Sequence, residues 1–300
     1  MILSVSRRTD IPANYAQWFF GRLREGRVMA RNPRNARRMA EIPLNPQAVD
    51  AIVFWTKNPA PLLDGLPFLA PYPYYVQITI TAYGEDVEPR VPSKEGIVLP
   101  AVRRLADAIG PERVVWRYDP ILLSRAYTAA RHLECFARIA RALSGYTRRC
   151  VIGFVEAYAN TRRNAQGMGL EAITPEAMHA LAGPLARIAR AEGMEMAACC
   201  EPEDFAAHGI GPARCIDAAL LERIAGRPLG LAKDRNQRAL CGCAASVDIG
   251  AYNTCLNGCL YCYANYNARA VQANAAAHDV ASPLLVGNVD AVRDVVRGRN

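Results

Sequence analysis

The expected architecture is most legible in residues 114–156, which read VVWRYDPILLSRAYTAARHLECFARIARALSGYTRRCVIGFVE. Two short runs at its ends, Val114–Tyr118 and Val151–Val155, are rich in the β-branched and aromatic residues typical of strands. Between them, Leu133, Phe136 and Ile139 recur at the spacing of one helix face. A strand, a helix and a second strand in this order predict two parallel strands joined by a crossover helix.

The same alternation continues on both sides of this stretch. Further strands are predicted near Leu3–Ser6, Ala51–Trp55, Tyr75–Thr81 and Glu195–Cys199. Six such units predict an α/β fold, a full or partial (β/α) barrel of the TIM type over residues 1–228. We expect the cysteine-rich segment 229–300 to pack on the same domain, because a chain of 300 residues can build one large core.

Neither a membrane span nor an export signal is predicted. No run approaches the roughly 20 apolar residues that a transmembrane helix needs, and the apolar stretch after Met1 is too short for a signal peptide. We therefore expect a cytoplasmic protein without a membrane partner. Its ten cysteines should stay reduced, which favours metal ligands or catalytic groups over disulfides.

The positive charge is a weaker indication of function. A formal net charge of +8 and a pI near 9.1 would suit an anionic partner such as nucleic acid. However, nearly all basic residues are arginines, a pattern that compositional bias also produces. The patches Arg31 to Arg38 and Arg162-Arg163 are therefore expected to be solvated surface.

The most specific motif is Cys255-Leu-Asn-Gly-Cys259-Leu-Tyr-Cys262. Three thiolates in so short a loop can hold one 4Fe-4S cluster and leave one iron open to a small molecule. The amine and carboxylate of S-adenosylmethionine could chelate that iron, and an electron from the cluster could split the sulfonium bond. The alternative is a zinc site, for which cysteine pairs such as Cys259 and Cys262 are typical.

A second group consists of Cys199 or Cys200, Cys215, Cys241 and Cys243. Four thiolates would complete the coordination of a second 4Fe-4S cluster or of a structural zinc. The close Cys241-Gly-Cys243 spacing favours a metal site, and we narrowly prefer Cys199 to Cys200. Each of the other cysteines of the group could equally be an ordinary buried residue.

Polar residues follow most of the predicted strands, and in a parallel barrel these strand ends meet at one rim. A guanidinium suits the carboxylate of a methionine group, and a carboxylate suits its ammonium or a ribose hydroxyl. Salt bridges across the barrel mouth would explain the same residues, and Lys57 could also be a plain surface lysine. The candidates assigned to cofactor binding are Arg7, Arg8, Glu156 and Tyr261, and those assigned to catalysis are Lys57, Arg117 and Asp119.

The spacing of the three cysteines and the aromatic Tyr261 resemble the radical S-adenosylmethionine superfamily, whose members have a full or partial (β/α) barrel. Over nearly its full length the chain also resembles an uncharacterised family called domain of unknown function eighteen forty-eight. The matching stretches are SVSRRTDIPA, FWTKNP, WRYDPI, KDRNQR and DIGAYNTCLNGCLYCYAN. This resemblance implies a radical-type cluster near the C-terminus and no established substrate.

The position of the cysteine loop departs from the superfamily pattern, in which the loop follows the first barrel strand. Here it follows all six predicted units, so we expect a radical S-adenosylmethionine-like barrel that is circularly permuted. In that arrangement Ser246–Ile249 is the strand that leads into the loop, and it lies beside the N-terminal strand. The loop should then lie at the rim that carries Arg7, Lys57, Arg117 and Glu156.

Three functions follow from these features. The leading one is an enzyme that generates a 5'-deoxyadenosyl radical, acts on a small-molecule or nucleic-acid substrate and takes electrons from a donor such as ferredoxin or flavodoxin. The second is a nucleic-acid-binding protein stabilised by zinc or an iron-sulfur cluster, which would bind more weakly as salt increases. The third is an electron carrier, for which a barrel of this size is large.

Overall fold

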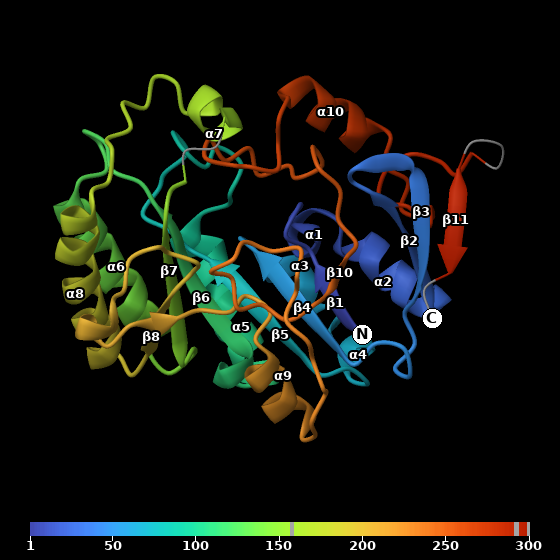
Figure 1. Ribbon diagram of the computed structural model, residues 1–300, viewed down its shortest axis with the longest axis horizontal. Helices are drawn as coiled ribbons and strands as arrows, with labels where there is room; N and C mark the ends of the chain where they lie inside the picture. The colour runs from blue at the N-terminus through green and yellow to red at the C-terminus, as the bar shows by residue number, and fades with distance from the viewer. Residues whose placement is uncertain (157–158, 291–293, 299–300) are drawn as a thin grey trace.

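An eight-stranded sheet forms the centre of the protein in the computed structural model, which describes residues 1–156, 159–290 and 294–298 (Figure 1). Each strand runs parallel to its neighbours. In spatial order the strands are β10 (Val247–Asp248), β1 (Ile2–Val5), β4 (Ala51–Thr56), β5 (Tyr74–Thr79), β6 (Val114–Ile121), β7 (Arg149–Phe154), β8 (Glu195–Ala198) and β9 (Gly211–Pro212).

The strands are apolar on both faces because both faces are covered, as is usual for parallel sheets. Alternate residues of β6 illustrate this: Trp116 packs into the larger hydrophobic cluster on one face and Val115 into the smaller cluster on the other. Ile152 and Val151 divide in the same way on β7. Successive side chains of β6 and β7 therefore point to opposite faces of the sheet.

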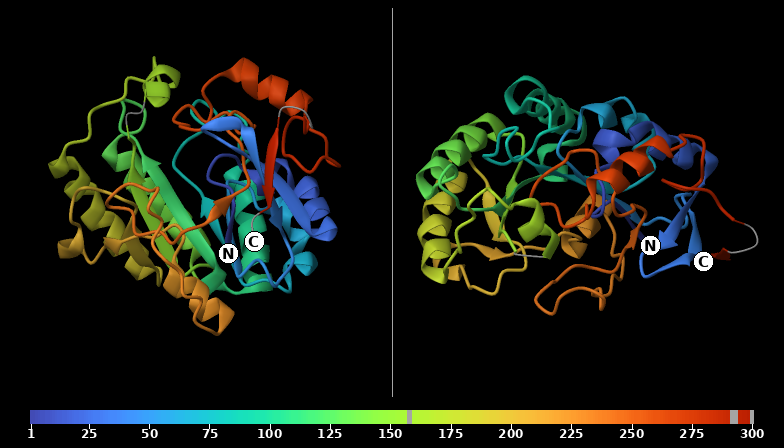
Figure 2. Two further views of the ribbon diagram at one scale, coloured as in Figure 1. Left: turned by 45° about the vertical axis from the view of Figure 1, so that its right-hand side comes forward. Right: turned by 90° about the horizontal axis from the view of Figure 1, so that it is seen from above.

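Helices cover the convex face of the sheet. Trp18, Leu105, Phe136 and Leu185 come from four of these helices and share the larger cluster with the outward residues of the strands. Viewed from above, the helices follow the curve of the sheet (Figure 2). The helices of this layer are α1 (Ile11–Asn14), α2 (Ala16–Glu25), α3 (Ala60–Leu63), α4 (Leu66–Leu69), α5 (Leu99–Ile109), α6 (Ala129–Leu143) and α8 (Pro175–Ala191).

The concave face is filled by residues 213–244 and by α9 (Ala218–Ala225). Ile216 and Leu221 pack there against Val53 and Val151 of the sheet. Figure 1 shows the segment between α9 and β10 crossing in front of the sheet. The C-terminal part of the chain therefore belongs to the same core as the βα units.

The prediction of an α/β fold built on parallel strands is confirmed. The six strands predicted from the sequence correspond to β1, β4, β5, β6, β7 and β8. Within the described ranges the sheet is an open series with β10 and β9 at its ends, so a closed barrel stays a prediction. Nowhere in those ranges does a helix combine the length and apolar character that crossing a membrane requires.

A small sheet that the sequence did not indicate lies beside the main one. It contains β2 (Arg27–Asn32), β3 (Asn35–Pro43) and β11 (Val295–Gly298), in the order β11-β3-β2. The side chains of Arg34, Arg37 and Arg38 are exposed at its hairpin, which agrees with the expected solvated surface. Two helices, α7 (Ala159–Asn164) and α10 (Ala268–Ala276), lie at the end of the molecule where the main strands finish (Figure 1).

Candidate functional site

The cysteine loop leaves the carboxyl end of β10, directly beside the carboxyl end of β1. The register pairs Leu3 with Val247 and Ser4 with Asp248 in parallel. The predicted strand at Ser246–Ile249 and its place next to the N-terminal strand are thereby confirmed. Strands from opposite ends of the sequence therefore form the part of the rim at which the cysteine loop begins.

The carboxylate of Asp248 holds these two strand ends together. It accepts hydrogen bonds from the hydroxyls of Ser4 and Ser6, each at 2.7 Å, and from the backbone N–H of Arg7 at 2.8 Å. It also accepts from the backbone N–H of Gly250 at 2.9 Å. A Cβ atom at Gly250 would lie 2.0 Å from the Ser6 hydroxyl oxygen, so this approach requires glycine.

Asp10 joins three segments beneath the cysteine loop. Its Oδ1 accepts from the N–H of Ala13 at 3.0 Å and so caps α1. Its Oδ2 accepts from the backbone N–H of Lys57 at 2.8 Å and from the Asn257 amide at 2.9 Å. Burial raises the pKa of Asp10, although these hydrogen bonds oppose the shift. Asn257 belongs to the loop between Cys255 and Cys259, so Asp10 fixes the loop to the sheet.

A buried ionic cluster supports the other side of the loop. The Nζ atoms of Lys57 and Lys94 each lie 2.7 Å from a different carboxylate oxygen of Glu88. The hydroxyls of Thr81 and Tyr261 also donate to Glu88. Burial alone would raise the pKa of Glu88, but the two lysines hold it at about 2.

Lys57 is therefore a buried cation and not a plain surface lysine. Burial would lower its pKa, but the negative charge of Glu88 and the nearby Cys259 raise it overall. Its ammonium lies 5.4 Å from the centre of the Tyr261 ring. The structure thus brings Lys57 and Tyr261 to the cysteine loop together, while their predicted roles in catalysis and cofactor binding remain predictions.

The three thiols of the loop affect one another. Burial raises the pKa of Cys255 and of Cys262, and it raises that of Cys259 to about 12. The neighbouring cysteines raise the pKa of Cys255 and Cys259 further, whereas Lys57 opposes this at Cys259. Metal binding replaces the thiol protons and removes this mutual repulsion.

Three cysteine thiols and one buried cation, Lys57, make up the donor set at the loop. Across the described residues, no three or more histidine, cysteine, aspartate or glutamate side chains form a group that could hold a metal ion. A cluster has several irons, and each takes a separate thiolate, so its ligands need not converge on one point. The loop supplies three thiolates, and the cation Lys57 lies beside Cys259 to balance their negative charge.

Arg7 and Arg8 lie at the edge of the loop, as predicted, and both contact β10. Their guanidinium groups are 3.9 Å from Asp248, and Arg8 also lies 5.5 Å from the centre of the Tyr252 ring. The hydroxyl of Tyr263 donates to the carbonyl of Arg7. These ion pairs agree with the alternative in which salt bridges account for the two arginines, and a role in binding a cofactor stays a prediction.

The other predicted rim residues contact different segments of the chain. Arg117 and Asp119 form an ion pair on the inner face of β6, and Arg117 donates to the Cys215 sulfur at 3.2 Å. Glu156 is exposed and forms an ion pair with Arg238. Of the four residues expected at the rim, Lys57 lies at Tyr261 and Arg7 at Tyr263, and the place of Arg117 and Glu156 at the same rim stays a prediction.

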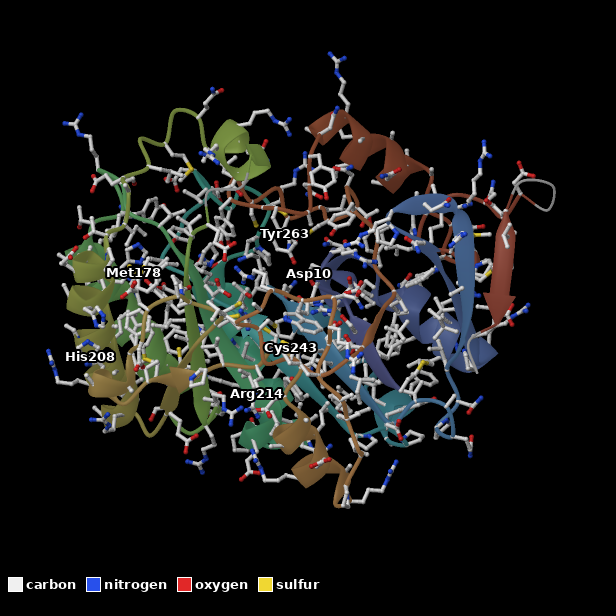
Figure 3. All side chains as sticks on the ribbon, in the orientation of Figure 1. Asp10, Met178, His208, Arg214, Cys243 and Tyr263 are labelled. Atoms are coloured by element: carbon white, nitrogen blue, oxygen red, sulfur yellow. The ribbon has the colours of Figure 1, made fainter. Side chains whose placement is uncertain are left out.

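The second predicted cysteine group is also brought together. The sulfurs of Cys199 and Cys215 are 3.4 Å apart, and Cys200 is in hydrogen-bonding contact with Cys241. Figure 3 labels Cys243 of this group, and it also labels Asp10 and Tyr263, of which Asp10 accepts from Asn257 in the cysteine loop. All ten cysteines lie in the described residues, and none of them forms a disulfide.

The fold and these contacts define an α/β protein with two cysteine groups, one at the carboxyl edge of a parallel sheet and one on its concave face. The model of the family described as "Domain of unknown function (DUF1848)" matches residues 2–264. The chain belongs to that family, as its resemblance predicted. No curated relative matches the chain.

Proposed function

We propose that this protein is a radical S-adenosylmethionine-type enzyme whose 4Fe-4S cluster is bound by Cys255, Cys259 and Cys262. The observation that supports this most is the position of the loop, at the carboxyl ends of β10 and β1 and held by Asp10 and Asp248. Ligand sites in parallel α/β sheets commonly lie at this edge. When bound, such a cluster supplies the electron that cleaves the sulfonium bond of S-adenosylmethionine.

The residues around the loop would fix its conformation and its charge. Asp10 anchors the turn through Asn257, and Glu88 anchors Tyr261, the residue before the third cysteine. Lys57 brings a buried positive charge next to Cys259. Lys57 and Lys94 both form ion pairs with Glu88. These pairs hold the positive charge of Lys57 at a fixed position inside the protein.

Arg7 and Arg8 are the candidates for the methionine carboxylate. At 3.9 Å from Asp248, their guanidinium groups are beyond ordinary hydrogen-bond length. Each also donates one hydrogen bond at 3.3 Å, Arg7 to Ser246 and Arg8 to the carbonyl of Gly250. A guanidinium has five N–H donors, so both arginines keep donors for a carboxylate.

The same proposal includes a cytoplasmic location, a small-molecule or nucleic-acid substrate and a reductant of the ferredoxin or flavodoxin kind. It is tested by reconstituting the protein without oxygen, adding a reductant and S-adenosylmethionine, and measuring 5'-deoxyadenosine. Cys259→Ala should reduce the product to background. Cys135→Ala, on α6, is the matched control and should leave it unchanged.

Two results would contradict the proposal. One is a fully loaded cluster that does not cleave S-adenosylmethionine, and the other is unchanged turnover in Cys259→Ala. Zinc without iron in protein purified away from oxygen would instead favour the nucleic-acid-binding alternative.

A further inference from the structure

Five cysteines from three separate segments meet on the concave face of the sheet, and we call them the inner thiol group. Two follow β8, one precedes α9 and two precede β10. They pack with the smaller hydrophobic cluster, together with Ile216 and Val151. The members are Cys199, Cys200, Cys215, Cys241 and Cys243.

The contacts within the inner thiol group are continuous. Cys199 and Cys215 are 3.4 Å apart through their sulfurs, and the thiol of Cys215 also contacts that of Cys243. Cys243 contacts Cys241, which in turn contacts Cys200. Core packing alone seldom gathers five thiols in this way, because buried cysteines behave as small, independent apolar residues.

The backbone at Cys200 supports a specific role. Its φ is +57°, in the left-handed region that non-glycine residues rarely occupy. In an extended strand, neighbouring side chains point to opposite faces, so Cys199 and Cys200 would diverge. Here the chain turns at Cys200, and both thiols join the same group. Such strain is most often found at functional sites.

Hydrogen-bond donors point at the sulfurs of the inner thiol group. The backbone N–H groups of Cys215 and Ile216 donate to the Cys243 sulfur at 3.2 and 3.4 Å. Arg117, which is only 6% exposed, donates to the Cys215 sulfur at 3.2 Å. Donors and a buried cation suit charged sulfur ligands, whereas an uncharged apolar core would not need them.

We propose that the inner thiol group binds a second iron-sulfur cluster. Cys199, Cys215 and Cys243 are ligands, and the fourth thiolate comes from the adjacent Cys200 and Cys241 pair. A cluster is favoured over zinc because Arg117 and two backbone N–H groups donate to the sulfurs of Cys215 and Cys243, and hydrogen bonds to sulfur are one means by which proteins set the potential of a cluster. Arg117 hydrogen-bonds to a ligand sulfur and is a positioning residue.

The test uses the triple variant in which Cys255, Cys259 and Cys262 are all alanine, so that the loop of the proposed active site cannot contribute. Iron, acid-labile sulfide and zinc are measured per chain after purification without oxygen. Two four-iron clusters give about eight irons in the native protein, and the triple variant should retain about four. Adding Cys215→Ala and Cys243→Ala should remove the rest, whereas adding Cys135→Ala should not.

A triple variant without iron or sulfide, or with zinc alone, would overturn the proposal. Because this readout does not involve S-adenosylmethionine, failure here is distinguishable from failure of the proposed activity. Should the quintuple variant not fold, Arg117→Gln in the triple variant provides a second measurement. Loss of a positive donor should shift the reduction potential of the remaining cluster to more negative values, and an unchanged potential would count against the assignment.

Discussion

Replacing Glu88 by glutamine tests whether the buried ionic cluster stabilises the fold beside the cysteine loop. The change keeps the shape of the side chain but leaves Lys57 and Lys94, each 2.7 Å from a carboxylate oxygen, without their counter-charge. The pKa of Glu88 falls from 4.5 to about 2 in the folded protein. At about 1.4 kcal/mol per pKa unit, this corresponds to roughly 3 kcal/mol at neutral pH.

The same figure follows from a second consideration, because removing one partner of a buried ion pair costs about 3–5 kcal/mol. The dependence on pH has a definite sign. Since folding lowers the pKa of Glu88, its contribution is complete above pH 4.5 and is lost as the pH falls toward 2. The penalty of Glu88→Gln should therefore be full at pH 7 and shrink below pH 4.5.

The assay is urea unfolding of the metal-free protein between pH 7 and pH 3.5, followed by circular dichroism, with native protein and variant side by side. The matched control is Glu95→Gln, because Glu95 pairs with Arg138 at 3.6 Å on the surface, where both side chains are exposed. Its effect should stay within about 0.5 kcal/mol. A penalty for Glu88→Gln below about 1 kcal/mol at pH 7, or one that does not change with pH, would refute the reasoning.

Three further substitutions test the anchors of the loop. Gly250→Ala should destabilise by about 1–3 kcal/mol, seen as a lower melting temperature, because its Cβ would lie 2.0 Å from the Ser6 hydroxyl. Gly211→Ala is the control and should change the melting temperature little, because a Cβ there meets no atom within 4 Å. Asp248→Asn should weaken the junction by about 2 kcal/mol in urea unfolding, since an amide nitrogen replaces either Oδ2, which accepts from Ser4 and Arg7, or Oδ1, which accepts from Ser6 and Gly250; an unchanged midpoint would contradict that role. Tyr261→Phe should cost about 1 kcal/mol by the same assay through loss of its hydrogen bond to Glu88. The cost should be smaller if Glu88→Gln is already present, because an amide oxygen is a weaker acceptor than a carboxylate.

Much of the main sheet could be predicted from sequence because its strands are buried on both faces. β4 and β7 each contain an apolar run, residues 51–55 and 150–154, so length and composition identify them without any tertiary information. β3 gave no such indication, because its first four residues, which include Arg37 and Arg38, are exposed and it pairs with a distant C-terminal strand. The two-residue strand β9 is too short to leave a pattern.

The cysteines of the candidate site could be predicted from their spacing in the sequence, whereas the residues that support them could not. Glu88 lies in a loop, and it becomes buried only because Lys57, Lys94 and Tyr261 approach it from three other segments. Arg117 was placed correctly on a strand. Its side chain points to the concave face, and only the position of residues 213–244 determines that Cys215 meets it there.

The pairing of β1 with β10 has a consequence for biosynthesis. During translation, β1 leaves the ribosome long before Val247 has been made, so one edge of β1 waits without its partner while the intervening units assemble. Contacts between residues so far apart in sequence close late and slowly. Asp248 can join the strand ends only then, so the cluster proposed for the loop would find its site only after nearly the whole chain has been made.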